Sequence, residues 1–371
     1  MHSMRFIGLG LRSLTGGLLV CCMGAGQAAV IDDLYTATVE RRTDVTDERA
    51  TAQSDAMAAV LVRVTGSRAA LGAPELRHLI DSPARYVASF GNLSATEAMV
   101  SFLPGALEQE LTAAGWPLWG AERPLSMLWI AVTDQFGERA ILSAGQLHED
   151  AEYSESMIAL LARIREEIDD VAELRGLPYV LPSFTNHEDV LLSFDDVWSY
   201  SFGNLELVSD AYDADAMVIA RVRESVIGTD VEWLVRAGSL RTSYPGAGVA
   251  DGIDWLADIF AQEYSSVGGE RVVTLRVSGV RDFDTYARVL AYLESVSVLS
   301  EVNVASFRGS ELLLNVVSRG DPDVLSRTFG LDDVLRERTP SFGSQPLRTG
   351  NTLELTVVPE RPSVFAPTPL R

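Results

Sequence analysis

The sequence predicts an α+β or α/β protein built from three small layered modules. Its 371 residues are more than one hydrophobic core usually holds, so two or three domains are expected. A hydrophobic content of 47% with 22% charged residues is typical of a folded chain. Segments with helical spacing of apolar residues alternate with short strand-like runs along the chain. We therefore expect helices packed on small sheets.

The first 28 residues are predicted to be a secretory signal peptide. Arg5 precedes an apolar segment at 6–20, and small residues follow up to Ala28, after which cleavage is expected. The mature chain would then begin at Ala29. No later segment is long and apolar enough to span a bilayer, so we expect an exported, soluble protein with no transmembrane segment after signal cleavage.

Both cysteines, Cys21 and Cys22, lie within this predicted signal. A mature chain without them has no disulfide, thiolate metal site or cysteine nucleophile. Lipoprotein anchoring at Cys21 is the alternative. Val20 argues against it, because a small residue is expected before such a cysteine.

The first module, residues 29–120, is expected to follow the order β-α-α-β-β-α. Apolar residues at helical spacing mark a helix at 46–64, and Gly66 follows as its stop signal. The other expected elements are strands at 34–41, 85–90 and 99–103 and helices at 74–80 and 104–114.

The central module, residues 121–267, begins where prolines and glycines break the chain at 115–124. The apolar run at 125–132 predicts a buried strand. The expected later elements are helices at 154–174, 202–212 and 253–264 and strands at 179–181, 216–222 and 231–236. This order predicts a two-layer or three-layer α/β sandwich.

The third module, residues 268–358, is expected to be ferredoxin-like. Its predicted elements are strands at 273–277, 298–307, 311–317 and 353–357 and helices at 283–293 and 321–336. Together they give the order β-α-β-β-α-β, which is a split β-α-β unit. The proline-rich tail at 359–371 is not expected to fold.

The charge of the chain excludes some partners. With a formal net charge of -22, it lacks the basic face that nucleic acid requires, and charge alone would not bring it to anionic lipid. All 30 basic side chains other than histidine are arginine. A GC-rich genome and a salt-adapted acidic surface are two explanations of this bias.

No catalytic, cofactor-binding or metal-ligating residue is predicted. His78, His148 and His187 have no spacing that would place two ligands on one helix face. The acidic clusters at 166–170, 195–196 and 213–215 lack the pattern of a calcium loop, so they are expected to be solvated. The glycine-rich segment at 246–252 resembles a dinucleotide loop, but its third glycine is one position late. It is better explained as a turn that starts a helix.

Three tryptophans lie near the break between the first two modules, at Trp116, Trp119 and Trp129. Indole rings bury large areas, so they are expected to form a core between the modules. Tryptophan is also frequent at interface hot spots, so a partner-binding patch is the functional alternative.

Several segments resemble a family of exported proteobacterial proteins that is catalogued as a domain of unknown function, number two thousand and sixty-six. They are AVLVRVTGSR at 59–68, GWPLWG at 115–120 and YDADAMVIARV at 212–222. The resemblance implies a periplasmic destination and no particular reaction. The central module also resembles α/β domains of envelope accessory proteins, such as the amino-terminal domain of TolB, penicillin-binding-protein activators and flagellar assembly protein T. Such a likeness concerns the fold and does not define a function.

These observations favour a non-enzymatic binding or scaffolding accessory of the cell envelope, with an envelope protein as partner and no cofactor. A hydrolase with an acidic pair in a cleft between modules, and a carrier of a small apolar ligand, are the alternatives. A paired, desolvated carboxylate in a pocket would favour the hydrolase. An exposed aromatic patch would favour the binding protein.

Overall fold

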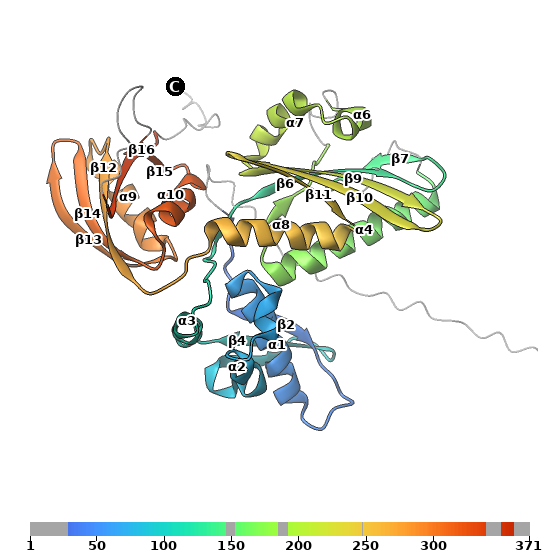
Figure 1. Cartoon of the computed structure of the whole chain (residues 1–371), viewed down its shortest axis with the longest axis horizontal. Helices are drawn as coiled ribbons and strands as arrows, with labels where there is room; N and C mark the ends of the chain where they lie inside the picture. Colours follow the sequence, from blue (N-terminus) through green and yellow to red (C-terminus); the bar gives the residue numbers. More distant parts are fainter. Residues whose placement is uncertain (1–28, 146–152, 185–191, 247, 339–349, 360–371) are drawn as a thin grey trace, which may run out of the picture.

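The computed structural model describes residues 29–145, 153–184, 192–246, 248–338 and 350–359, and it confirms the α+β class. The elements gather into three bodies that follow one another along the chain (Figure 1). The predicted signal peptide, and the tail after residue 359, lie outside the described residues. Within the described ranges, no helix combines the length and the apolarity that crossing a membrane requires.

The first module packs its helices against an antiparallel sheet in the order β2-β4-β3. Asp47 caps α1 by accepting a hydrogen bond from the N–H of Ala50 at 2.9 Å, and Gly66 ends α1 with a φ of 65°. The expected order β-α-α-β-β-α is present. Its elements are β2 (Thr36–Glu40), α1 (Glu48–Thr65), η1 (Arg68–Gly72), α2 (Arg77–Asp81), η2 (Pro83–Tyr86), β3 (Val87–Asn92), β4 (Glu97–Phe102) and α3 (Pro104–Ala113).

The central module is a three-layer sandwich. Its sheet has the order β11-β10-β9-β6-β7, and β8 pairs with β6 as well. Helices α4 and α8 pack on one face of the sheet, and α6 and α7 pack on the other (Figure 1). The elements are β6 (Ser126–Thr133), β7 (Arg139–Ile141), α4 (Glu155–Arg175), β8 (Tyr179–Val180), α6 (Phe194–Trp198), α7 (Phe202–Ser209), η3 (Asp210–Tyr212), β9 (Ala216–Ser225), β10 (Gly228–Ala237), β11 (Leu240–Gly246) and α8 (Val249–Tyr264).

The glycine-rich segment at 246–252 is explained by packing. Gly246 ends β11, Gly248 precedes α8, and Gly252 lies inside α8. A Cβ atom at Gly252 would overlap the indole of Trp233, which is buried on β10. Only glycine allows α8 to approach the sheet this closely.

The third module has a five-stranded sheet in the order β13-β14-β12-β16-β15. The expected β-α-β-β-α-β order is present with one strand added. The predicted helix at 321–336 ends at Gly330, and β15 then forms the outer edge, so β16 runs parallel to β12. The elements are β12 (Arg271–Ser278), α9 (Phe283–Ser295), β13 (Leu299–Arg308), β14 (Glu311–Ser318), α10 (Pro322–Gly330), β15 (Leu335–Glu337) and β16 (Thr352–Val357).

A short antiparallel pair lies where the three modules meet. Strand β1 (Ala29–Val30) pairs with β5 (Glu122–Arg123), which directly precedes β6. The first described residues of the chain therefore lie beside the segment that leads into the central sheet.

Candidate functional site

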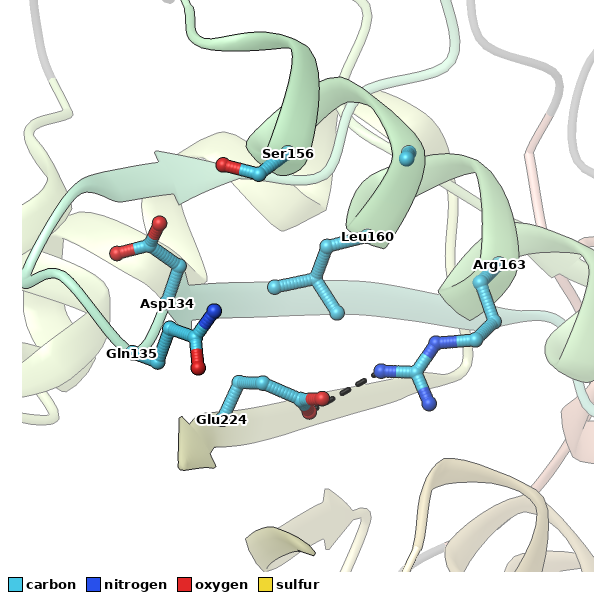
Figure 2. Close-up of a pocket in the computed structure, with 7 residues that line it drawn as sticks. Asp134, Gln135, Ser156, Leu160, Arg163 and Glu224 are labelled. Atoms are coloured by element: carbon cyan, nitrogen blue, oxygen red, sulfur yellow. Dashed lines mark ion pairs between the residues drawn. The ribbon is translucent and has the colours of Figure 1, made fainter. Parts of the chain in front are cut away.

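A pocket of about 290 Å³ lies at one edge of the central sheet, where two neighbouring strands end. Strands β6 and β9 are parallel, and Thr133 is paired with Arg223, so the residues that follow them, Asp134 and Glu224, share this edge. Helix α4 covers the pocket (Figure 2). The carboxyl ends of parallel strands are where α/β sheets usually bind ligands. This position makes the pocket the candidate functional site of the central module.

One ion pair joins the two sides of this pocket. Arg163 on α4 lies 3.1 Å from Glu224 on β9, measured between Nη2 and Oε2 (Figure 2). The hydroxyl of Thr229 donates a hydrogen bond of 2.6 Å to the same oxygen of Glu224. Arg163 also lies 3.9 Å from Glu167, one turn further along α4. Glu224 is thus held in place by groups of the protein itself.

Asp134 is different, because one of its oxygens has no partner. The side chain is buried, with 6% of the residue exposed. Its Oδ1 accepts hydrogen bonds from the N–H groups of Phe136 and Glu138 at 2.9 and 2.8 Å, which fixes the turn between β6 and β7. Its Oδ2 is buried and accepts no hydrogen bond within the described residues. A buried acceptor without a donor is rare in native proteins and calls for an explanation.

The three modules meet around a second set of polar side chains, of which Arg123 on β5 is fully buried. Its guanidinium donates to the carbonyl oxygens of Gly120, Trp119, Arg63 and Arg175 at 2.7, 3.1, 3.0 and 3.2 Å. It also lies 3.5 Å from the centre of the Trp119 ring. Arg63 and Arg175 belong to the last turns of α1 and α4, and helix C-termini carry partial negative charge. The buried cation is therefore stabilised by two helix ends and an aromatic ring.

Arg175 connects the same helices to α8. Its side chain is fully buried, and it lies 2.7 Å from Asp254 on α8 and 2.9 Å from the carbonyl oxygen of Gly66, to which it donates. Arg68 pairs with Asp254 as well, at 2.8 Å. These contacts tie the carboxyl end of α1 to α4 and α8.

The third module is attached by hydrogen bonds around Ser297. Glu122 accepts from the N–H and the hydroxyl of Ser297 at 2.7 and 2.6 Å. Arg319 donates to Ser297 and pairs with Glu108 of the first module, and Glu108 also accepts from the hydroxyl of Tyr35. Burial and then the hydrogen bond to Glu108 raise the pKa of Tyr35. A smaller pocket of about 170 Å³ lies among these residues.

Trp116, Trp119 and Trp129 form neither the expected core between the modules nor a single patch, because they belong to different cores. Trp116 packs on the first module and donates to Glu75 at 2.9 Å. Trp119 packs in the core between the central sheet and α4 and α8. Trp129 packs on the opposite face of that sheet and donates to Ser209 at 2.9 Å. Trp119 and Trp129 are 1% and 0% exposed, so neither is available to a partner on the surface.

An exposed aromatic cluster is found instead on the third module. Phe283, the first residue of α9, is 78% exposed and stacks on Tyr286 with ring centres 6.2 Å apart. Tyr286 contacts Phe307 on the edge strand β13 at 6.0 Å, and Phe307 is 49% exposed. Tyr286 has the same helical spacing as Val289 and Leu293, but it is only partly buried, whereas those two side chains are in the core. We call these three rings the aromatic cluster.

One carboxyl group between the central and third modules is strongly perturbed. The pKa of Asp215 is raised to about 7, mainly by burial and also by the charges of Asp332 and Asp333, although the hydrogen bond from Leu125 and the charge of Arg336 lower it. Its Oδ2 accepts a hydrogen bond from the N–H of Leu125 at 2.8 Å. Asp215 lines neither of the two pockets described above, so its position favours a structural role.

The remaining predicted groups are accounted for as follows. His78 lies 3.5 Å from Glu110 on the surface, whereas His148 and His187 lie outside the described residues. Asp196 accepts hydrogen bonds from Ser193, the residue that caps α6, and the cluster at 166–170 belongs to α4. Among the described residues there is no group of three or more histidine, cysteine or carboxylate side chains that could hold a metal ion.

Sequence reasoning did not identify Asp134, Arg123 or the aromatic cluster. Asp134 could have been identified from the sequence, because it is the first acidic residue after a long apolar strand. Its neighbour Glu224 could not be assigned to the same site, because the pairing of β6 with β9 is not encoded in local pattern.

A model for a domain of unknown function (DUF8605) matches residues 28–120, which are the first module. This match agrees with the expectation of an uncharacterised domain. Its number differs from that of the expected family, and the likeness of the central module to TolB stays a prediction. No curated protein and no solved structure matches the chain.

Proposed function

We propose that this protein is a non-enzymatic binding or scaffolding accessory of the cell envelope, acting in the periplasm. The aromatic cluster on the third module carries the proposal. Exposed aromatic side chains that contact one another are enriched at protein interfaces, because they bury large apolar areas on association. The partner is expected to be an envelope protein that presents apolar side chains to this surface.

The module junction supports a scaffolding role. Two of the carbonyl groups bound by Arg123 belong to helix ends in the first and central modules, and Glu122 fixes the third module through Ser297. Such buried hydrogen bonds require a defined geometry, so the modules would present their outer surfaces at fixed positions. The carboxylate in the junction pocket, Glu108, is engaged by Tyr35 and Arg319. We therefore rank the hydrolase with an acidic pair between modules below the binding protein.

The periplasmic location rests on the predicted signal peptide and on the resemblance to an exported family. Edman sequencing of the exported product should begin at or within a few residues of Ala29. A diacylated Cys21 at the amino terminus would instead identify a membrane-anchored lipoprotein.

A pull-down from periplasmic extract tests the binding function. The bait is the mature chain, compared with a Phe283→Ser/Phe307→Ser double variant. Phe136→Ser is the matched control, because Phe136 is 77% exposed but lies in the turn between β6 and β7. We expect a partner that is captured by the wild type and by Phe136→Ser. The double variant should not capture it. A partner retained equally by all three proteins would reject the aromatic cluster as its binding surface.

A further inference from the structure

The pocket at the ends of β6 and β9 has features of a ligand site that are independent of the aromatic cluster on the third module. It lies inside the central module, between the sheet and α4 (Figure 2). Its lining is mixed: Leu160 and Ala159 form an apolar wall, while Ser156 and Gln135 offer a hydroxyl and an amide. Such a combination of an apolar wall with a few polar groups is typical of small-molecule sites.

The unpartnered oxygen of Asp134 determines which chemical groups the ligand must carry. Oδ1 is saturated by the two N–H groups of the turn, so only Oδ2 remains as an acceptor. Figure 2 shows this carboxyl group on the side of the pocket where Ser156 lies. Leaving a buried charged acceptor without a donor costs free energy, and a bound donor would recover it. The ligand should therefore carry N–H or O–H groups at this point.

The charges of the pocket favour a cationic donor. Its lining contains the carboxylates of Asp134 and Glu224 and the single guanidinium of Arg163. Arg163 is paired with Glu224, so the charge of Asp134 has no counterion in the lining. A metal ion fits less well, because no third carboxylate, histidine or cysteine joins these two among the described residues. Hard cations usually take several oxygen ligands from the protein.

We infer that this pocket binds a small organic amine, whose ammonium group donates a hydrogen bond to Oδ2 of Asp134 while its aliphatic part contacts Leu160. Ser156 and Gln135 are placed to bind a hydroxyl group on the same ligand. The volume of about 290 Å³ accommodates a short amine.

Isothermal titration calorimetry on the whole mature protein tests this inference, with ethanolamine, putrescine and choline as probes. Choline carries a quaternary ammonium without an N–H, so it separates hydrogen bonding from charge. The wild type should bind a primary amine at least about tenfold more tightly than choline, as expected for a charge-assisted hydrogen bond. Equal affinity for choline, or no binding of either primary amine, would overturn the inference.

The Asp134→Asn variant provides a second test of the inference. The variant keeps an oxygen for the N–H groups of Phe136 and Glu138, and it replaces Oδ2 with an NH₂ donor, so the turn should still fold. Binding of the primary amine should weaken about tenfold or more. Asp284→Asn, which removes the same charge from an exposed position on the third module, should bind like the wild type. Unchanged affinity in Asp134→Asn, or a response to calcium alone, would contradict an amine site. The comparison of wild-type probes decides the question even if Asp134→Asn does not fold.

Discussion

Burying the guanidinium of Arg123 is costly, because the charge loses its hydration. Among the described residues, no carboxylate forms an ion pair with this charge. Its N–H groups all point to backbone carbonyls, including those at the ends of α1 and α4. The planar fork of arginine can supply such a set of donors, whereas the ammonium of lysine could not reach them all. Burial of the cation and its Arg63 neighbour lower the pKa of Arg123, but the helix ends favour its charged form.

The ring of Trp119 lies against this guanidinium. Among single substitutions, truncation of Trp119 should cause the largest loss of packing. Trp119→Ala removes a fully buried indole and leaves a cavity between the central sheet and its helices. We expect a loss of about 3–5 kcal/mol in the free energy of unfolding, measured by urea titration. Trp116→Ala is the control, because Trp116 is partly exposed and its hydrogen bond goes to a surface carboxylate. Equal losses in the two variants would contradict the assignment of Trp119 to the core.

Asp215 should make stability depend on pH. Its pKa is about 7 in the folded protein, above the value of about 3.9 in an unfolded chain, so the folded state holds the proton more tightly. Binding of this proton by Asp215 therefore stabilises the folded state. The stabilisation is fully present below about pH 4 and is lost as the pH rises to about 7. Asp215→Asn stays neutral and can still accept from Leu125.

Urea unfolding at several pH values measures this contribution. The stability of Asp215→Asn relative to the wild type should rise between about pH 4 and pH 7 and then level off. Asp170→Asn, at an exposed position on α4, should show no such rise. Parallel pH profiles for the wild type and Asp215→Asn would show that Asp215 does not titrate in this range.

At the scale of elements, the end of α1 is fixed by a glycine that meets two requirements. Gly66 has a φ of 65°, and a Cβ atom there would overlap Ala261 on α8 and the ring of Trp119. Gly66→Ala should therefore incur both the cost of a left-handed alanine, about 1 kcal/mol, and an overpacking cost of about 1–3 kcal/mol. Gly137→Ala has a φ of 84° and nothing within 4 Å, so it should incur the backbone cost alone. Thermal unfolding of both variants measures the difference, and equal shifts would show that α1 and α8 can separate at this point.

The sequence predicted those elements whose pattern is local and strong. The apolar stripe of α4, the stop at Gly66 and the alternation in β12 and β16 all reflect burial of one face. It did not predict β7, β11, β15 or α6, which are short or lie at sheet edges. In these elements tertiary contacts, rather than periodicity, decide the conformation. Tertiary contacts also decide the pocket at the ends of β6 and β9, because Asp134 and Glu224 become neighbours only through the pairing of these two strands.

At the scale of the whole molecule, the first two modules share a segment and the third does not. Leu118 packs in the first core and Trp119, the next residue, in the central core. Leu118 also exchanges two backbone hydrogen bonds of 2.9 Å with Ser266 at the end of the central module, and the N–H of Trp119 donates to Val64 of α1 at 2.8 Å. Neither of these modules can unfold without disrupting the core of the other.

The third module has a core of its own and is attached through polar contacts around Ser297 and through Arg327 of α10, which donates to the carbonyl oxygen of Glu263 on α8 at 2.6 Å. Calorimetry of the mature chain should therefore show two transitions, one for the first and central modules together and one for the third. The isolated fragment 269–359 should unfold cooperatively near the midpoint of the second transition. Trp119→Ala should lower the midpoint of the first transition only. A single transition for the whole chain, or a random-coil spectrum for the fragment, would show that these polar contacts couple the third module to the rest as strongly as the shared segment couples the first two modules.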